Sequence, residues 1–163
     1  MNQFKGNIAI LGSGNIGISL AKGLVKANYA LPGQISLTRR NISNLSSLAE
    51  QGFLTSTDNA AVVAAADIVV LAVLPQQLNQ LLDQIRPGVN PEKDLFISVA
   101  SGVSCAHISS KLGESIQVRQ QTADVLVHPH EHVLHFMAGG TELVADQIER
   151  REAHAQVLGA DAA

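Results

Sequence analysis

Short apolar runs alternate with longer amphipathic stretches over the first 120 residues, and this alternation constrains the fold more than any other feature. The short runs are typical of buried strands and occupy residues 7–11, 34–38, 68–73, 95–99 and 116–118. Between them, apolar residues recur at helical spacing over 15–28, 43–51, 58–66, 78–85 and 106–112. Strands that alternate with helices build βαβ units. We therefore predict an α/β fold, a doubly wound and mostly parallel sheet with helices on both faces.

The composition restricts the class of protein further. Apolar residues make up 46% of the 163 residues, which is ample for a packed core. The net charge of −3, without a basic block, argues against a nucleic-acid partner. Cys105 is the only cysteine, and no early apolar run is long enough for a signal peptide or a membrane span. We expect a cytoplasmic protein that binds neither nucleic acid nor a membrane.

The first predicted strand leads into Gly12-Ser-Gly14-Asn-Ile-Gly17, the spacing G-x-G-x-x-G at the start of a predicted helix. In this context Gly12 permits a tight turn, Gly14 lets the backbone approach a pyrophosphate, and Gly17 lets the helix pack against the strand. The helix N-terminus also attracts phosphate. We therefore predict an NAD(P)-binding Rossmann fold; the alternative is an ordinary glycine-rich turn. The predicted apolar face of this helix consists of Ile16, Leu20, Leu24 and Ala27.

The end of the second predicted strand indicates which dinucleotide binds. NAD-binding proteins usually carry an acidic residue there, which holds the ribose 2′-hydroxyl. This chain has Arg39 and Arg40 instead. Two guanidinium groups can hold a 2′-phosphate by charge-assisted hydrogen bonds, so we predict NADP(H) as the cofactor. The alternative is a solvated pair of loop charges.

Several further motifs follow one another in a characteristic order. They occupy residues 10–16 with 21–23, 58–59, 66–76, 97–103 and 118–119. In this order, from residue 7 to 119, they resemble the pyrroline-5-carboxylate reductases, NADPH-dependent enzymes of proline biosynthesis. The resemblance implies reduction of a small imino acid, 1-pyrroline-5-carboxylate, to L-proline.

The resemblance also implies a set of cofactor-binding residues, although it identifies no catalytic side chain. The pyrophosphate side comprises Leu11, Gly12, Ser13, Gly14, Asn15 and Ile16, next to Gly17 of the glycine motif. Arg39, with Arg40 beside it, lies at the 2′-phosphate, and Asn59 lies near the adenosine. The nicotinamide side comprises Ala72, Val73, Leu74, Pro75, Ala100, Ser101 and Gly102. For Ala72, Val73 and Ala100, plain core packing is the alternative.

The chain departs from the family pattern in ways that suggest a second function. Leu74 stands where the family usually has lysine, and the proline-asparagine motif expected after Arg119 is missing. The helical C-terminal dimerisation domain of the family is also absent from these 163 residues. The alternative to a reductase is thus a catalytically incomplete NADP-binding module. A third hypothesis is a deazaflavin-dependent NADP reductase, against which residues 97–103 and 118–119 argue.

The sequence changes character after the predicted Rossmann domain of residues 1–119. Residues 120–163 carry four of the six histidines between positions 128 and 135, and helical periodicity returns only near 147–158. His128, His130 and His132 alternate as metal ligands on a strand could, but Pro129 interrupts such a strand. We predict no metal site there, and a tail that holds at most a last strand and helix of the same domain. We keep a homo-oligomer as an expectation despite the missing dimerisation domain.

Overall fold

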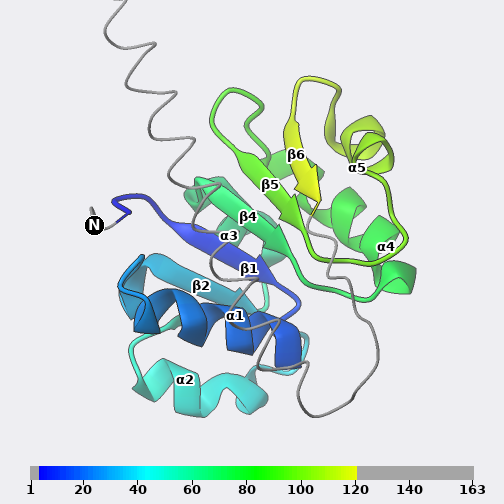
Figure 1. Ribbon diagram of the computed structural model, residues 1–163. Coiled ribbons are helices and arrows are strands. Elements are labelled where there is room, and N and C mark those ends of the chain that lie inside the picture. The colour runs from blue at the N-terminus through cyan, green and yellow to red at the C-terminus, as the bar shows by residue number, and fades with distance from the viewer. Residues whose placement is uncertain (1–3, 121–163) are drawn as a thin grey trace, which may run out of the picture.

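The structure, a computed structural model that describes residues 4–120, places six parallel strands in one sheet (Figure 1). In chain order the strands and α-helices are β1 (Ile8–Leu11), α1 (Asn15–Lys26), β2 (Ile35–Thr38), α2 (Ser46–Glu50), β3 (Leu54–Ser56), α3 (Asn59–Ala65), β4 (Ile68–Leu71), α4 (Pro75–Ile85), β5 (Leu95–Ser98), α5 (Cys105–Leu112) and β6 (Gln117–Gln120). Three short 3-10 helices occupy Pro32–Gln34, Ile42–Leu45 and Arg86–Gly88.

The strand order is β3-β2-β1-β4-β5-β6, so the direction of winding reverses at β1. Ile8 of β1 lies opposite Ile35 of β2 on one side and opposite Ile68 of β4 on the other. Every neighbouring pair of strands is parallel. In open α/β sheets, such a reversal leaves a crevice beyond the carboxyl ends of the two central strands. The predicted doubly wound fold is confirmed.

The side chains of each strand alternate between two hydrophobic cores, one on each face of the sheet. Ile8 and Ile10 pack into the first core, with apolar residues of α1 and α2, whereas Ala9 and Leu11 pack into the second. The second core receives the apolar faces of α3, α4 and α5. Figure 1 shows the same division of the helices between the two sides of the sheet. Both cores form because a parallel strand is buried on both faces.

Three strands differ from the sequence-based expectations, and one of them is β6, which ends at Gln120, two residues beyond the end of the predicted strand. β3 was not predicted, because its three residues include Leu54, which is 53% exposed, and give no clear apolar run. β4 ends at Leu71, two residues before the end of the predicted strand. Ala72 still donates its N–H to the Leu11 carbonyl at 2.9 Å, but Leu74 is already the N-cap of α4. The residues after Leu71 therefore form a loop at the carboxyl edge of the sheet.

Some expectations concern residues that the structure does not describe. The histidine cluster at 128–135, the periodic segment at 147–158 and the predicted tail lie outside residues 4–120. The division into a domain of 1–119 and a tail therefore stays a prediction. Within the described part of the chain, no helix has the length and apolar character needed to cross a membrane.

Candidate functional site

The turn between β1 and α1 lies at the point where the winding reverses, and its first and last glycines are required by the fold. Gly12 has a φ of +85°, and a Cβ added there would overlap Val73 Cγ1. A Cβ on Gly17 would lie 3.1 Å from the Gly12 carbonyl oxygen and 3.1 Å from Ile10 Cγ2. Gly12 thus permits the tight turn, and Gly17 lets α1 approach β1 closely.

Gly14 differs from these two glycines because the space beside it is open. A Cβ built on Gly14 meets no atom within 4 Å, and its backbone is extended, with a φ of −83°. No side chain caps α1, and no acidic residue lies in its first turn. Among the described residues, Ile18 is the first of this helix whose N–H has a backbone partner, the Gly14 carbonyl at 3.0 Å. An open turn that precedes unpaired N–H groups at a helix N-terminus is suited to a phosphate.

Leu11 and Ser13 shape this turn from within the protein. Both side chains are fully buried. The Ser13 N–H donates to the Thr38 carbonyl at 2.8 Å, and the Ser13 hydroxyl donates to the Ile10 carbonyl at 3.3 Å. These bonds fix the turn against the end of β2. Leu11 and Ser13 are therefore suited to holding the backbone in place rather than to contact through their side chains.

Ile16 is exposed, although its helical spacing predicted a place on the apolar face of α1. Its side chain is 47% exposed, whereas Leu20 and Leu24 are buried in the first core. The prediction was wrong for Ile16 because the first turn of α1 lies at the carboxyl edge of the sheet, beyond the apolar layer. Asn15 is exposed in the same turn.

The two arginines follow β2 directly, at the same edge of the sheet. The Arg39 N–H donates to the Ser56 carbonyl at 3.3 Å, which ties the start of this loop to the end of β3. The Arg39 side chain is half-buried, and Arg40 is exposed. Neither guanidinium has an ion-pair or hydrogen-bond partner among residues 4–120. Both are thus available to an anionic ligand.

The loops after β4 and β5 bring the remaining predicted residues to the crevice edge. Ala72 and Val73 are half-buried, and Leu74 is 64% exposed just before Pro75, the first residue of α4. After β5, Ala100 is buried, while Ser101 and Gly102 are exposed. Ala100 lies in the second core, Val73 packs against that core and Ala72 packs against the first, as the core-packing alternative expects. The Ala100 N–H donates to the Ser98 hydroxyl at 3.3 Å.

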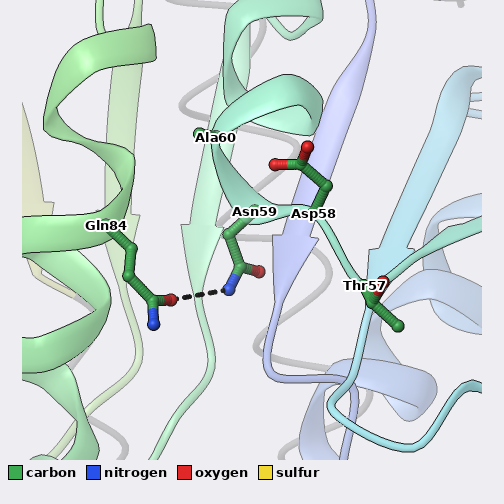
Figure 2. Close-up of a pocket in the computed structure, with 5 residues that line it drawn as sticks. All are labelled: Thr57, Asp58, Asn59, Ala60 and Gln84. Carbon is green, nitrogen blue, oxygen red and sulfur yellow. Dashed lines mark hydrogen bonds between the residues drawn. The ribbon is translucent and has the colours of Figure 1, made fainter.

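An open polar hollow of about 460 Å³ lies between the start of α3 and the last turns of α4. It is lined by Thr57, Asp58, Asn59, Ala60 and Gln84. Figure 2 shows the Asn59 and Gln84 amides turned toward each other; Asn59 Nδ2 donates to Gln84 Oε1 at 3.2 Å. Asn59 was a predicted site residue, whereas sequence reasoning missed Gln84. No pattern marks Gln84, since it is one of several polar residues on the outer face of α4.

Comparison with known proteins agrees with this geometry. A family model described as "NADP oxidoreductase coenzyme F420-dependent" matches residues 7–102, more than half of the chain. The chain belongs to this family. The matched segment begins just before β1 and ends in the loop after β5, so it contains the glycine turn, both arginines and the predicted nicotinamide side.

Known relatives confirm the resemblance to the pyrroline-5-carboxylate reductases that the motifs indicated. Pyrroline-5-carboxylate reductase 1 of Dictyostelium discoideum is 38% identical over 118 residues, which are 72% of this chain and 21% of the relative. Pyrroline-5-carboxylate reductase 2 of the same organism is 40% identical over 107 residues, 65% of this chain and 36% of the relative. The solved pyrroline-5-carboxylate reductase of Coxiella burnetii superposes with a TM-score of 0.66 at 31% identity, over 71% of this chain and 43% of that protein. The chain thus spans less than half the length of these relatives.

Proposed function

We propose that this chain binds NADP(H) at the carboxyl edge of its sheet and acts in the reduction of 1-pyrroline-5-carboxylate to L-proline. The observation that carries the proposal is the open turn at Gly14, where an added Cβ meets nothing although the helix behind it has unpaired N–H groups. A turn without a ligand has no need for a glycine in this extended conformation. The family description, which names NADP, supports the same cofactor.

The residues at this edge fit the parts of NADP(H) in order. The turn from Gly12 to Gly17 would hold the pyrophosphate through backbone N–H groups. Arg39 and Arg40, whose guanidinium groups have no partner among the described residues, would hold the 2′-phosphate. An acidic residue in their place would repel that phosphate.

The residues beyond β4 and β5 would flank the nicotinamide. Residues 72–75 and 100–102 meet at the crevice because β4 and β5 are neighbouring parallel strands. NADPH, when bound, supplies the hydride for the C=N carbon of the imine. The role of these residues would be to orient the nicotinamide ring and to shield one side of it from water. We assign no catalytic side chain, since no ionisable group belongs to the proposed nicotinamide side within residues 4–120.

The choice of substrate rests on the relatives. The family description names coenzyme F420, which supports the hypothesis of a deazaflavin-dependent reductase. Identity to the pyrroline-5-carboxylate reductases favours the imine instead, because it extends over 118 residues in the Dictyostelium enzyme, beyond the length of the family match. The hypothesis of a catalytically incomplete NADP-binding module is supported by Leu74, which stands where the family usually has lysine.

The decisive experiment compares NADPH with NADH. We expect the wild-type chain to bind NADPH about tenfold or more tightly, because each charge-assisted contact contributes roughly 1.5–3 kcal/mol. Replacing both Arg39 and Arg40 by alanine should weaken the binding of NADPH and leave the affinity for NADH nearly unchanged, as measured by isothermal titration calorimetry. Equal losses for the two cofactors would assign the arginines to the fold, and no binding by the wild type would refute the proposal.

Two further properties belong to this proposal. We propose a cytoplasmic location, which the single cysteine of the sequence supports. We also propose weak homo-oligomerisation, which the exposed side chains of Ile16 and Leu74 support. Cell fractionation and sedimentation velocity test the two properties separately.

A further inference from the structure

We infer that the outer edge of β3 is a contact surface between two copies of this chain, formed by antiparallel pairing of β3 with β3 of the second copy. β3 (Leu54–Ser56) is the last strand on its side of the sheet, and β2 is the strand to which it is paired. The inference goes beyond the proposed function, because it does not depend on the binding of NADP(H).

The backbone of Thr55 presents one donor and one acceptor on this edge. In a strand paired in parallel, both backbone groups of one residue point to the neighbouring strand, and those of the next residue point away. The Ser56 carbonyl points to β2, because it accepts the Arg39 N–H at 3.3 Å. The N–H and the carbonyl of Thr55 therefore face outward, where no residue of 4–120 bonds them. Such an edge is a template for another strand.

The β3 edge lacks the features with which proteins usually prevent edge pairing. Charged side chains and proline on the edge strand are the common protection. β6, at the opposite edge of the sheet, carries the exposed Arg119. β3 reads Leu-Thr-Ser, and residues 29–38, 41–49 and 51–57 contain no charged residue. A second copy can thus approach β3 without meeting like charges in these segments.

Exposed apolar side chains gather at the same edge. Among the described residues, five large hydrophobic side chains are exposed, and three of them, Leu31, Ile42 and Leu54, lie in β3 or beside it. Leu54 belongs to the strand itself. Leu31 precedes one 3-10 helix and Ile42 begins another, and both of these helices contact β3. Removal of these side chains from water would favour association.

β3 is complementary to itself when two copies pair in antiparallel fashion around Thr55. The two Thr55 residues would then lie opposite each other and exchange both of their outward hydrogen bonds. Their side chains would form a threonine pair, a favourable cross-strand combination, on one face. The two Leu54 side chains would lie diagonally on the other face, about 7–8 Å apart. A two-fold axis at Thr55 thus pairs both edges at once, as a symmetric dimer requires.

The charges at the two ends of β3 are complementary in this arrangement. Glu50 is exposed at the end of α2, before the amino end of β3. The carboxyl end is bonded to Arg39, with the exposed Arg40 next to it, and these two cations outnumber the one acid that follows β3, Asp58. Antiparallel pairing turns the Glu50 end of one copy toward the arginine end of the other. Unlike charges therefore support a second copy in this orientation.

The first test measures self-association of the full 163-residue chain without cofactor, by sedimentation equilibrium. A three-residue strand makes a small contact, so we expect a weak dimer, with a dissociation constant on the order of 100 µM. Leu54→Lys places a charge from each copy on one face of the pair, so the dissociation constant should rise at least about tenfold. Gln80→Lys is the matched control, because it adds the same charge at an exposed position of α4, and it should leave the constant unchanged.

The second test fixes the register by disulfide formation in a Cys105→Ser background, which removes the only native cysteine. Opposite Thr55 residues would have Cα atoms about 5.5 Å apart, within the range that a disulfide spans. Two Thr57 residues would lie about 14 Å apart, since each is two residues from the axis. After mild oxidation, Thr55→Cys should therefore form a covalent dimer at least about tenfold faster than Thr57→Cys, although Thr57 is the more exposed of the two.

Three outcomes would overturn the inference. A wild type that stays monomeric at about tenfold above the expected constant would leave the edge to residues 121–163 or to a strand of another protein. Self-association that Leu54→Lys does not weaken would assign the contact to another surface, such as the exposed Ile16 and Leu74 at the crevice. Equal rates of disulfide formation for the two cysteine variants would indicate random collision instead of a register centred on Thr55.

Discussion

At the residue scale, three glycines of one motif are required for different reasons. Gly12 is fixed by its positive φ and by Val73, and Gly17 by the close approach of α1 to Ile10. Gly14 has neither constraint in the protein alone. A ligand in the open turn, as we propose, would give this position a reason to be glycine. The spacing of the motif could be read from the sequence, but the distinction between its members needed the distances.

We predict that Gly14→Val folds normally and loses NADPH binding. The added side chain meets no protein atom within 4 Å of its Cβ, and an extended backbone accepts a β-branched residue. It would occupy the space in which the pyrophosphate approaches the backbone. Thermal unfolding should give a midpoint close to that of the wild type, while calorimetry detects no NADPH binding.

Gly17→Val provides the contrast. Its Cβ would press on the Gly12 carbonyl oxygen and on Ile10 at 3.1 Å, so this variant should lose stability as well as binding. Undiminished NADPH binding by a folded Gly14→Val variant would remove the turn from the proposed site.

At the scale of secondary structure, the sequence predicted the features that depend on residues close together in the chain, such as the start of a helix. Asp58 and Ser104 accept backbone N–H groups as N-caps of α3 and α5, at 3.0 and 3.2 Å. The predicted helix over 58–66 begins at Asp58, because aspartate before an apolar stretch is typical of a helix start. β3 could not be predicted, since three residues at a sheet edge are defined by pairing with β2 rather than by their own pattern. Gln84 was missed for a related reason, because only the packing of α4 beside α3 gives it a partner.

The cap of α5 leads to a prediction about stability. Ser104→Ala removes the hydroxyl that accepts the His107 N–H, and it should lower the free energy of unfolding by about 1 kcal/mol. Ser115→Ala is the control, because Ser115 is exposed and forms no hydrogen bond within residues 4–120. Urea denaturation followed by circular dichroism measures both changes. Equal effects of the two substitutions would show that the cap contributes nothing specific.

At the scale of the whole molecule, the parallel sheet gathers the end of every strand at one edge. The glycine turn follows β1, the arginines follow β2, and the loops that we propose for the nicotinamide side follow β4 and β5. These segments are far apart in the sequence, and the reversal at β1 brings them to one crevice. This gathering followed from the alternation of strands and helices, which is why most of the candidate site could be placed before the fold was known.

At this scale, cofactor binding and catalytic turnover have different structural requirements. We predict that the 163-residue chain binds NADPH but reduces 1-pyrroline-5-carboxylate far more slowly than a full-length relative does. Binding needs the turn and the arginines, which the described residues supply. Turnover needs the imine held about 3–3.5 Å from the nicotinamide carbon in a dry pocket, and a misplacement of ~1 Å costs about a hundredfold. On the proposed nicotinamide side, Leu74 is 64% exposed, and Ser101 and Gly102 are exposed as well.

The measurement follows the loss of NADPH absorbance with and without the imine, using the Dictyostelium pyrroline-5-carboxylate reductase 2 as the active control. NADPH binding by the same preparation, measured in parallel, shows that the chain is folded. We expect a rate at least about a hundredfold below that of the control, as expected for a poorly held substrate. A rate within about tenfold of the control would contradict the prediction, because it would require a closed pocket that the exposed residues at this edge do not form by themselves.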